Sequence, residues 1–237
     1  MIYSKICGVS DYKTLKFIVN HKYPPKFIGF ILNYKKSKRF VSFQKLKKLL
    51  TYKKKVKYVA VLVNPDEKIL KKISLTNKFD YIQLYDVLPN KLKEIKKKYR
   101  LKIIYALTIK KKSDIYKYKN FSKFSDIILF DSKGYEKSLR FNHSWMKNIP
   151  DNFKKMIAGN ILYNENLDKF KKIADIVDIS GSLETNGKKD FKKINIFLNN
   201  LKKLNDKIKK KKFLLLINTI KMVFGEENLV GISYQKH

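Results

Sequence analysis

The sequence predicts an α/β protein: a single-domain (β/α)8 barrel (TIM barrel) with an extra C-terminal segment. Short runs rich in β-branched and aromatic residues alternate with longer lysine-rich segments along most of the 237 residues. Strands that alternate with helices form parallel sheets. Eight such units in about 200 residues suit a closed barrel better than an open sheet.

Eight strand candidates follow one another at nearly regular spacing. They are Ile2–Cys7, Phe27–Leu32, Tyr58–Val63, Tyr81–Leu84, Lys102–Ala106, Asp126–Phe130, Lys155–Ala158 and Ile176–Ile179. In barrels of this kind the active site gathers at the C-terminal ends of the strands. The polar or small residues expected at those ends are therefore site candidates: Cys7, Asn33, Gln83, Asp131, Gly159 and Ser180.

Helix-like segments with apolar residues at helical spacing lie between the strands. They are Ser42–Leu50, Asp66–Ile73, Leu92–Tyr99, Asn164–Ile173 and Phe191–Leu204. Capping signals precede several of them: Ser10 before the first helix, and Asn64-Pro65-Asp66 before the third.

The strand–helix pattern stops after Leu204, so residues 1–204 form the predicted barrel and 205–237 a basic and apolar extension. A lysine cluster at 207–212 precedes the run "FLLLINTIKMVF", which is too short to span a bilayer. Three interpretations of the extension remain open: an extra helix packed on the barrel, a poorly ordered tail, and a surface or partner anchor.

The formal net charge of +35 suggests a polyanion partner, but its make-up argues against a specific nucleic-acid site. Only Arg39, Arg100 and Arg140 are arginine, and base and phosphate recognition depends on that side chain's planar fork. The lysines are spread over the whole chain. Drift toward A- and T-rich codons is the favoured explanation, and a polyanion-binding surface is the alternative.

The single cysteine excludes an intrachain disulfide and fits a reducing cytosol, so we expect a cytoplasmic protein. No signal-peptide pattern and no apolar run of about 18 residues is present, so no membrane span is expected. His21, His143 and His237 lack metal-ligand spacing, so we expect no metal site.

Several short motifs, in order, resemble the phosphoribosylanthranilate isomerase family of tryptophan biosynthesis, whose fold is a (β/α)8 barrel. The resemblance covers roughly residues 3 to 204. The motifs are "KICGVSD" from Lys5, "FIGFILNYKKSKRFVS" from Phe27 with its Ser-x-Arg turn, "VLVN" from Val61, "IQLYD" from Ile82, "ILFDS" from Ile128, "IAGNILYNENL" from Ile157 and "VDISGSLETNGKKD" from Val177.

The resemblance implies a cofactor-free Amadori rearrangement of a phosphosugar substrate, N-(5'-phosphoribosyl)anthranilate, into a 1-amino-1-deoxyketose. An acid must protonate the furanose ring oxygen, and a base must take the C2 proton. By resemblance Cys7 is the base, Asp131 the acid and Arg39 the group that holds the anthranilate carboxylate. Without the resemblance, Cys7 would be a small buried apolar residue, Asp131 a cap or surface carboxylate and Arg39 a solvated turn residue.

The resemblance also implies substrate-binding roles for residues of strand four and of the turns after strands seven and eight. They are Gln83, Gly159, Asn160, Asp178, Ser180, Gly181 and Ser182. This chain departs from the family pattern at Tyr85-Asp86 for His-Gly, at Asn160 for the second glycine, at Ser180-Gly181-Ser182, and in a glycine-poor loop at 132–141. Because Asn tolerates a left-handed backbone, Gly159-Asn160 can still form its turn. Ser138 and Arg140 are candidate phosphate contacts in the altered loop.

Two functions remain open alongside the isomerase, for which we expect a monomer or a homodimer. One is a divergent barrel with altered or lost activity that binds another phosphosugar. The other is a basic module that binds nucleic acid through charge alone.

Overall fold

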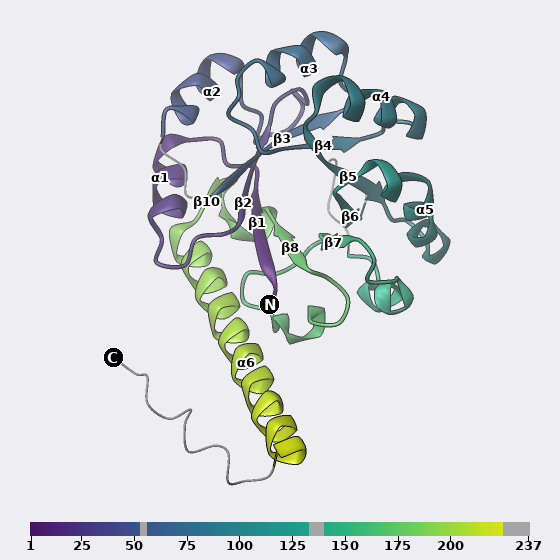
Figure 1. Ribbon diagram of the computed structural model, residues 1–237. Coiled ribbons are helices and arrows are strands. Elements are labelled where there is room, and N and C mark those ends of the chain that lie inside the picture. The colour runs from purple at the N-terminus through teal and green to yellow at the C-terminus, as the bar shows by residue number, and fades with distance from the viewer. Residues whose placement is uncertain (53–55, 133–139, 225–237) are drawn as a thin grey trace.

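The computed structural model describes residues 1–52, 56–132 and 140–224. Eight parallel strands lie side by side in chain order, and the last pairs with the first to close the predicted barrel (Figure 1). The strands are β1 (Tyr3–Cys7), β2 (Phe27–Ile31), β3 (Lys57–Val63), β4 (Tyr81–Tyr85), β5 (Lys102–Thr108), β6 (Ile127–Asp131), β7 (Lys154–Ile157) and β8 (Ile176–Ile179). All eight strand predictions are confirmed to within about two residues at each end.

Helices surround the barrel on the outside (Figure 1). The α-helices are α1 (Tyr12–Asn20), α2 (Phe43–Leu50), α3 (Glu67–Ser74), α4 (Pro89–Tyr99), α5 (Tyr118–Phe121) and α6 (Phe191–Phe224). The 3-10 helices are η1 (Lys112–Lys117), η2 (Ser122–Phe124), η3 (His143–Asn148), η4 (Leu167–Phe170) and η5 (Gly181–Leu183). A two-stranded hairpin of β9 (Glu184–Thr185) and β10 (Lys188–Lys189) follows β8.

Two local predictions are wrong. The cap of α1 is Asp11 and not Ser10, because the Asp11 carboxylate accepts hydrogen bonds from both the amide and the hydroxyl of Thr14. The helix predicted over Asn164–Ile173 is only the short η4. Its polar residues form local bonds that compete with a longer helix, since Glu165 accepts from the Leu162 amide and Asn166 accepts from the Asp168 amide.

The core has two layers, as the strand pattern requires. Outward-facing strand residues pack against the helices in one large apolar cluster. Inward-facing residues fill the barrel axis, among them Phe27, Val59, Leu129, Met156 and Ile176. Such filling is usual for eight-stranded barrels, whose interior is a packed core and not a pore. The site can therefore form only above the last filled layer, at the C-terminal strand ends.

Helix α6 runs without a break past Leu204, the predicted end of the barrel. Its first half buries an apolar stripe on the barrel through Ile194, Phe197, Leu201 and Leu204. Farther on the helix projects away from the barrel (Figure 1), and the side chains of 213–216 are at least half exposed. Of the three interpretations of the extension, the structure shows a helix over residues 205–224, but it continues the barrel's last helix and is not packed on the barrel at 213–216. Across the described residues, no helix combines the length and apolarity needed to cross a membrane.

The start of β1 is fastened to α6 by one side chain. The Asn205 amide accepts from the Ile2 backbone N–H and donates to the Ile2 carbonyl, both at 2.8 Å. We expect Asn205→Ala to lower the free energy of unfolding by about 1–3 kcal/mol, because two partly buried backbone groups lose their partner. Urea denaturation measures this change.

Asn199→Ala is the matched control, because the Asn199 amide bonds only to Asn195 within α6. That variant should change stability by about 0.5 kcal/mol or less. Equal losses in the two variants would contradict the role assigned to Asn205.

Candidate active site

One cavity of about 350 Å³ opens at the C-terminal ends of the strands. Its wall includes Cys7 from β1, Tyr85 from β4, Asp131 from β6 and Asp178 from β8. The loops after β7 and β8 complete it with Gly159, Asn160, Ser180, Gly181 and Ser182, and Arg39 reaches it from the loop after β2. The barrel thus brings together residues that lie up to about 175 positions apart in the sequence.

The floor of the site holds a buried ion pair beside Cys7. Lys5 is fully buried, and its Nζ lies 2.8 Å from Oδ2 of Asp178. Lys5 and Cys7 point to the same face of β1 because strand residues alternate. Gly29 on the paired strand β2 leaves room for both side chains because it has none of its own. An added Cβ there would lie 2.9 Å from Cys7 Sγ and 3.1 Å from Lys5 Cε. Gly29 was not among the predicted site residues, because its role depends on side chains of another strand.

Opposing effects act on the thiol. Burial raises the pKa of Cys7 above its ordinary value, and the negative charge of Asp178 acts in the same direction. The cations of Lys5 and Lys189 act against this and favour the thiolate. Burial alone would lower the pKa of Lys5, but Asp178 and Cys7 outweigh it, so the pKa is raised and Lys5 stays charged.

Asp131 has the surroundings of a carboxylic acid that holds its proton near neutral pH. Burial raises its pKa to about 7, and the charge of Asp178 contributes, while a hydrogen bond from Tyr85 lowers it. The Tyr85 hydroxyl donates to Oδ2 at 3.0 Å. The other oxygen, Oδ1, is buried and has no partner among the described residues. The cavity therefore has a proton donor on β6 and a potential base on β1.

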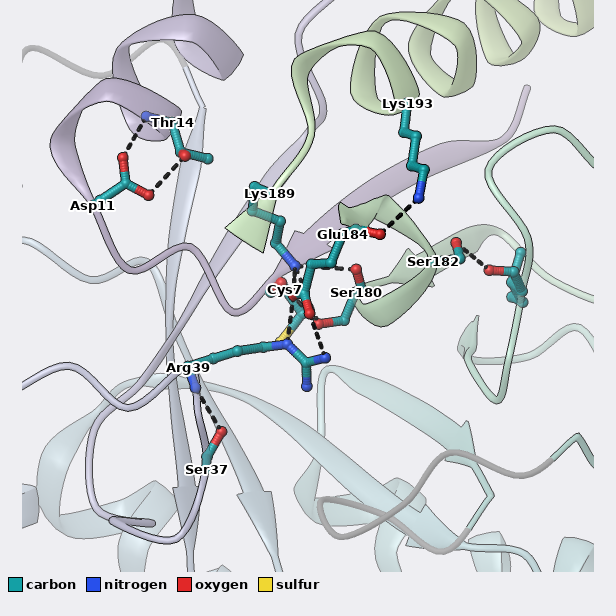
Figure 2. Close-up of polar contacts among 11 residues, drawn as sticks. Cys7, Asp11, Thr14, Ser37, Arg39, Ser180, Ser182, Glu184, Lys189 and Lys193 are labelled. Atoms are coloured by element: carbon teal, nitrogen blue, oxygen red, sulfur yellow. Dashed lines mark hydrogen bonds and ion pairs between the residues drawn. The ribbon is translucent and has the colours of Figure 1, made fainter. Parts of the chain in front are cut away.

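Arg39 crosses over the rim of the barrel close to Cys7. Its Nε and Nη2 donate to the two carboxylate oxygens of Glu184 at 2.6 and 2.8 Å, and Lys189 reaches the same carboxylate at 2.6 Å (Figure 2). Gly8, with φ of +73°, leaves the passage open, since a Cβ there would lie 2.4 Å from Arg39 Cδ. Arg39 is thus fixed by its partner and is not a solvated turn residue.

Two predicted candidates do not contribute to the cavity directly. Asn33 donates to the Val63 carbonyl and accepts from the Val63 amide, both at 2.8 Å, so it joins the ends of β2 and β3. Gln83 is fully buried, and its amide nitrogen donates to the Tyr85 hydroxyl at 3.1 Å. Gln83 therefore reaches the site only through Tyr85.

The turns that replace family glycines keep a left-handed backbone. Asn160 has φ of 50° beside Gly159 at 94°, as the sequence predicted, and Asp86 has φ of 55° where the family motif has glycine. Ser182 joins the loops after β7 and β8 by donating to the Ile161 carbonyl at 2.7 Å. Arg140, one of the two candidate contacts in the loop at 132–141, donates to the Asn160 carbonyl at 2.8 Å. The other candidate, Ser138, and the loop's glycine, Gly134, lie outside the described residues.

These features define a class of protein: a (β/α)8 barrel with a thiol and a buried carboxyl in one cavity at the C-terminal ends of its strands. The model of the N-(5'-phosphoribosyl)anthranilate isomerase family matches residues 4–200. Among curated relatives, the N-(5'-phosphoribosyl)anthranilate isomerase of Clostridium acetobutylicum is 30% identical over 213 residues, covering 86% of this chain and 99% of the relative. That of Streptococcus mutans is 31% identical over 208 residues, covering 84% and 98%. The chain belongs to the N-(5'-phosphoribosyl)anthranilate isomerase family.

Solved structures agree on the fold. Phosphoribosyl anthranilate isomerase from Thermotoga maritima aligns with a TM-score of 0.75 at 24% identity, over 85% of this chain and 99% of that one. A phosphoribosyl anthranilate isomerase in complex with reduced 1-(o-carboxyphenylamino)-1-deoxyribulose 5-phosphate aligns with a TM-score of 0.73, with the same identity and coverage.

The charges of Lys5 and Asp178 act on the pKa of Cys7 in opposite directions, so we expect two variants to shift this pKa in opposite directions. Lys5→Met removes the nearest cation and should move the pKa of Cys7 farther up, whereas Asp178→Asn removes an anion and should move it down. The rate of alkylation by iodoacetamide as a function of pH reports the thiolate, and Cys7 is the only cysteine. Shifts in the same direction in both variants would contradict this arrangement of charges.

Proposed function

We propose that Cys7 and Asp131 are the base and the acid with which this chain isomerises N-(5'-phosphoribosyl)anthranilate in tryptophan biosynthesis. The observation that carries the proposal is that a thiol flanked by a buried lysine and a carboxyl with a pKa of about 7 share one cavity. Family membership supplies the reaction, and this geometry supplies an acid and a base that can act on one substrate.

The chemistry can be followed atom by atom. Asp131 gives its proton to the furanose ring oxygen, and the C1–O bond breaks to leave a protonated Schiff base. The Cys7 thiolate takes the C2 proton, and the electrons of the C2–H bond form the C1=C2 bond of an enolamine. The enolamine then tautomerises to 1-(o-carboxyphenylamino)-1-deoxyribulose 5-phosphate.

The remaining predicted residues suit the two ends of the substrate. Nε and Nη2 of Arg39 are taken by Glu184, which leaves Nη1 for the anthranilate carboxylate. We place the phosphate at the loops after β7 and β8, on Gly159, Asn160, Gly181 and Ser182. The hydroxyl of Ser180 donates to the Cys7 carbonyl at 3.0 Å. Oδ1 of Asp178 is buried without a partner among the described residues, so we assign it to a ribose hydroxyl.

The altered strand-four motif keeps one alternative open: a barrel that binds a phosphosugar without isomerising it. Binding of a sugar phosphate without turnover would favour that function. We further propose that the isomerase is cytoplasmic and acts as a monomer or a homodimer, without a specific nucleic-acid partner.

Loss of either group should slow turnover by about a hundredfold or more, the usual contribution of an acid or base. Cys7→Ser and Asp131→Asn are the variants, and kcat on freshly prepared phosphoribosylanthranilate is the measurement. Asn33→Asp is unsuitable as a control because Asn33 joins two strands. Ser144→Ala is a neutral control, because the Ser144 side chain is exposed on η3 and bonds to Asn142. Full activity of either site variant would refute its role.

The pH profile of kcat/KM should be bell-shaped, with its rising limb set by the pKa of Asp131 and its falling limb by the pKa of Cys7. The productive form has one proton on the pair, as thiolate and carboxylic acid. Below about pH 7 both groups are protonated, so kcat/KM should rise as pH passes the pKa of Asp131. It should fall only as pH passes the pKa of Cys7, which burial raises above its ordinary value. A fall in kcat/KM beginning below pH 7 would contradict these protonation states.

A further inference from the structure

Tyr85 stands where the family's strand-four motif has histidine, and it occupies the wall of the catalytic cavity. The side chain is 5% exposed and its hydroxyl lies 3.0 Å from Oδ2 of Asp131. Below it, the Gln83 amide nitrogen donates to the same hydroxyl at 3.1 Å. Gln83, Tyr85 and Asp131 thus form a linear chain of hydrogen bonds that ends at the proposed acid.

The direction of this chain follows from the donors available. Burial raises the pKa of Tyr85 well above its ordinary value, and the Asp131 charge adds to this, so the hydroxyl keeps its single proton. Because the oxygen of that hydroxyl already accepts from Gln83, its proton is directed at Asp131. Oδ2 is therefore an acceptor, and Oδ1, which has no partner in the part of the chain that the structure describes, is the oxygen that remains for a transferable proton.

We propose that Tyr85, held by Gln83, is a positioning residue that fixes Oδ2 of Asp131 and so makes Oδ1 the atom that protonates the substrate. Once Oδ1 has given up its proton, the carboxylate keeps a charge-assisted hydrogen bond from Tyr85. Tyr85 and Gln83 thereby stabilise the negative charge of the buried Asp131 carboxylate, as water does for an exposed one. This proposal rests on the proposed function of Asp131 as the acid.

Tyr85→Phe is the direct test, because it removes one hydroxyl and keeps the ring. A hydrogen bond to a charged group contributes enough that kcat should fall about tenfold or more, with little change in KM. The lower limb of the pH profile should move upward by about one pH unit, because Tyr85 lowers the pKa of Asp131. A rise in KM at unchanged kcat would overturn the proposal, since it would make Tyr85 a substrate contact.

A second readout does not depend on turnover. A titration of the Asp131 carboxyl by ¹³C NMR, assigned by its loss in Asp131→Asn, should show the same upward shift in Tyr85→Phe. Gln83→Leu should raise the pKa of Asp131 as well, but by less. In that variant the Tyr85 hydroxyl is still present but no longer accepts a hydrogen bond from Gln83. An unchanged Asp131 titration in both variants would overturn the proposal. The expected shift in a protein that shows no isomerase activity would support the hydrogen-bond chain and refute the proposed function.

Tyr105→Phe is the matched control. The Tyr105 hydroxyl is also buried and donates to a backbone carbonyl, that of Val87, at 2.9 Å, but it lies outside the cavity. Its loss should cost stability and leave both the Asp131 titration and the pH profile in place. A comparable shift in this control would assign the Tyr85→Phe effect to general loosening of the barrel and overturn the proposal.

A third variant, Tyr85→His, should have a higher kcat than Tyr85→Phe, because imidazole also carries an N–H donor that can bond to Asp131.

Discussion

The buried pair of Lys5 and Asp178 is the interaction on which the site depends. The two residues are direct partners in the β1–β8 ladder, the seam at which the barrel closes. A buried charge is stable only when it is paired, so removing one partner strongly destabilises the other. The same pair therefore helps to hold the first and last strands in register and places a cation beside Cys7. One ion pair thus contributes both to the closure of the barrel and to the charge around the proposed base.

The rest of the cavity balances charges around that pair. Asp131 and Asp178 both lie in a water-poor space, where burial disfavours two carboxylates at once and raises the pKa of each. At the rim, Glu184 pairs with both Arg39 and Lys189, which leaves net positive charge at the proposed site for the anthranilate carboxylate. The proposed acid, base and anion site thus depend on a few ion pairs, most of them between residues that are distant in the sequence.

The strands, and the positions of Cys7 and Asp131 at the cavity, could be predicted from sequence because their signals are local. Each strand is a short run rich in β-branched and aromatic residues that is buried along nearly its whole length, and Cys7 and Asp131 stand at strand ends in short motifs. Residues whose roles depend on distant partners could not be predicted. Gly29 matters only through Cys7 and Lys5 on another strand, and Glu184 matters through Arg39, 145 positions away.

Backbone geometry bears on two turns in which this chain has replaced a family glycine, those at Asp86 and Asn160. Of the six described non-glycine residues with positive φ, four are Asn and one is Asp, the residues that tolerate this region best. Asn160 and Asp86 stand where the family motifs have glycine. The left-handed turns have been kept while the glycines have been lost, so substitution at these two positions does not by itself argue against activity.

The most direct test of the account is a single turnover of phosphoribosylanthranilate that carries deuterium at C2. If the Cys7 thiolate removes that hydrogen in a step that limits the chemistry, the deuterated substrate should react more slowly than the ordinary one, and Cys7→Ala should show almost no conversion of either. Conversion by Cys7→Ala at the rate of the unaltered protein would contradict the central claim.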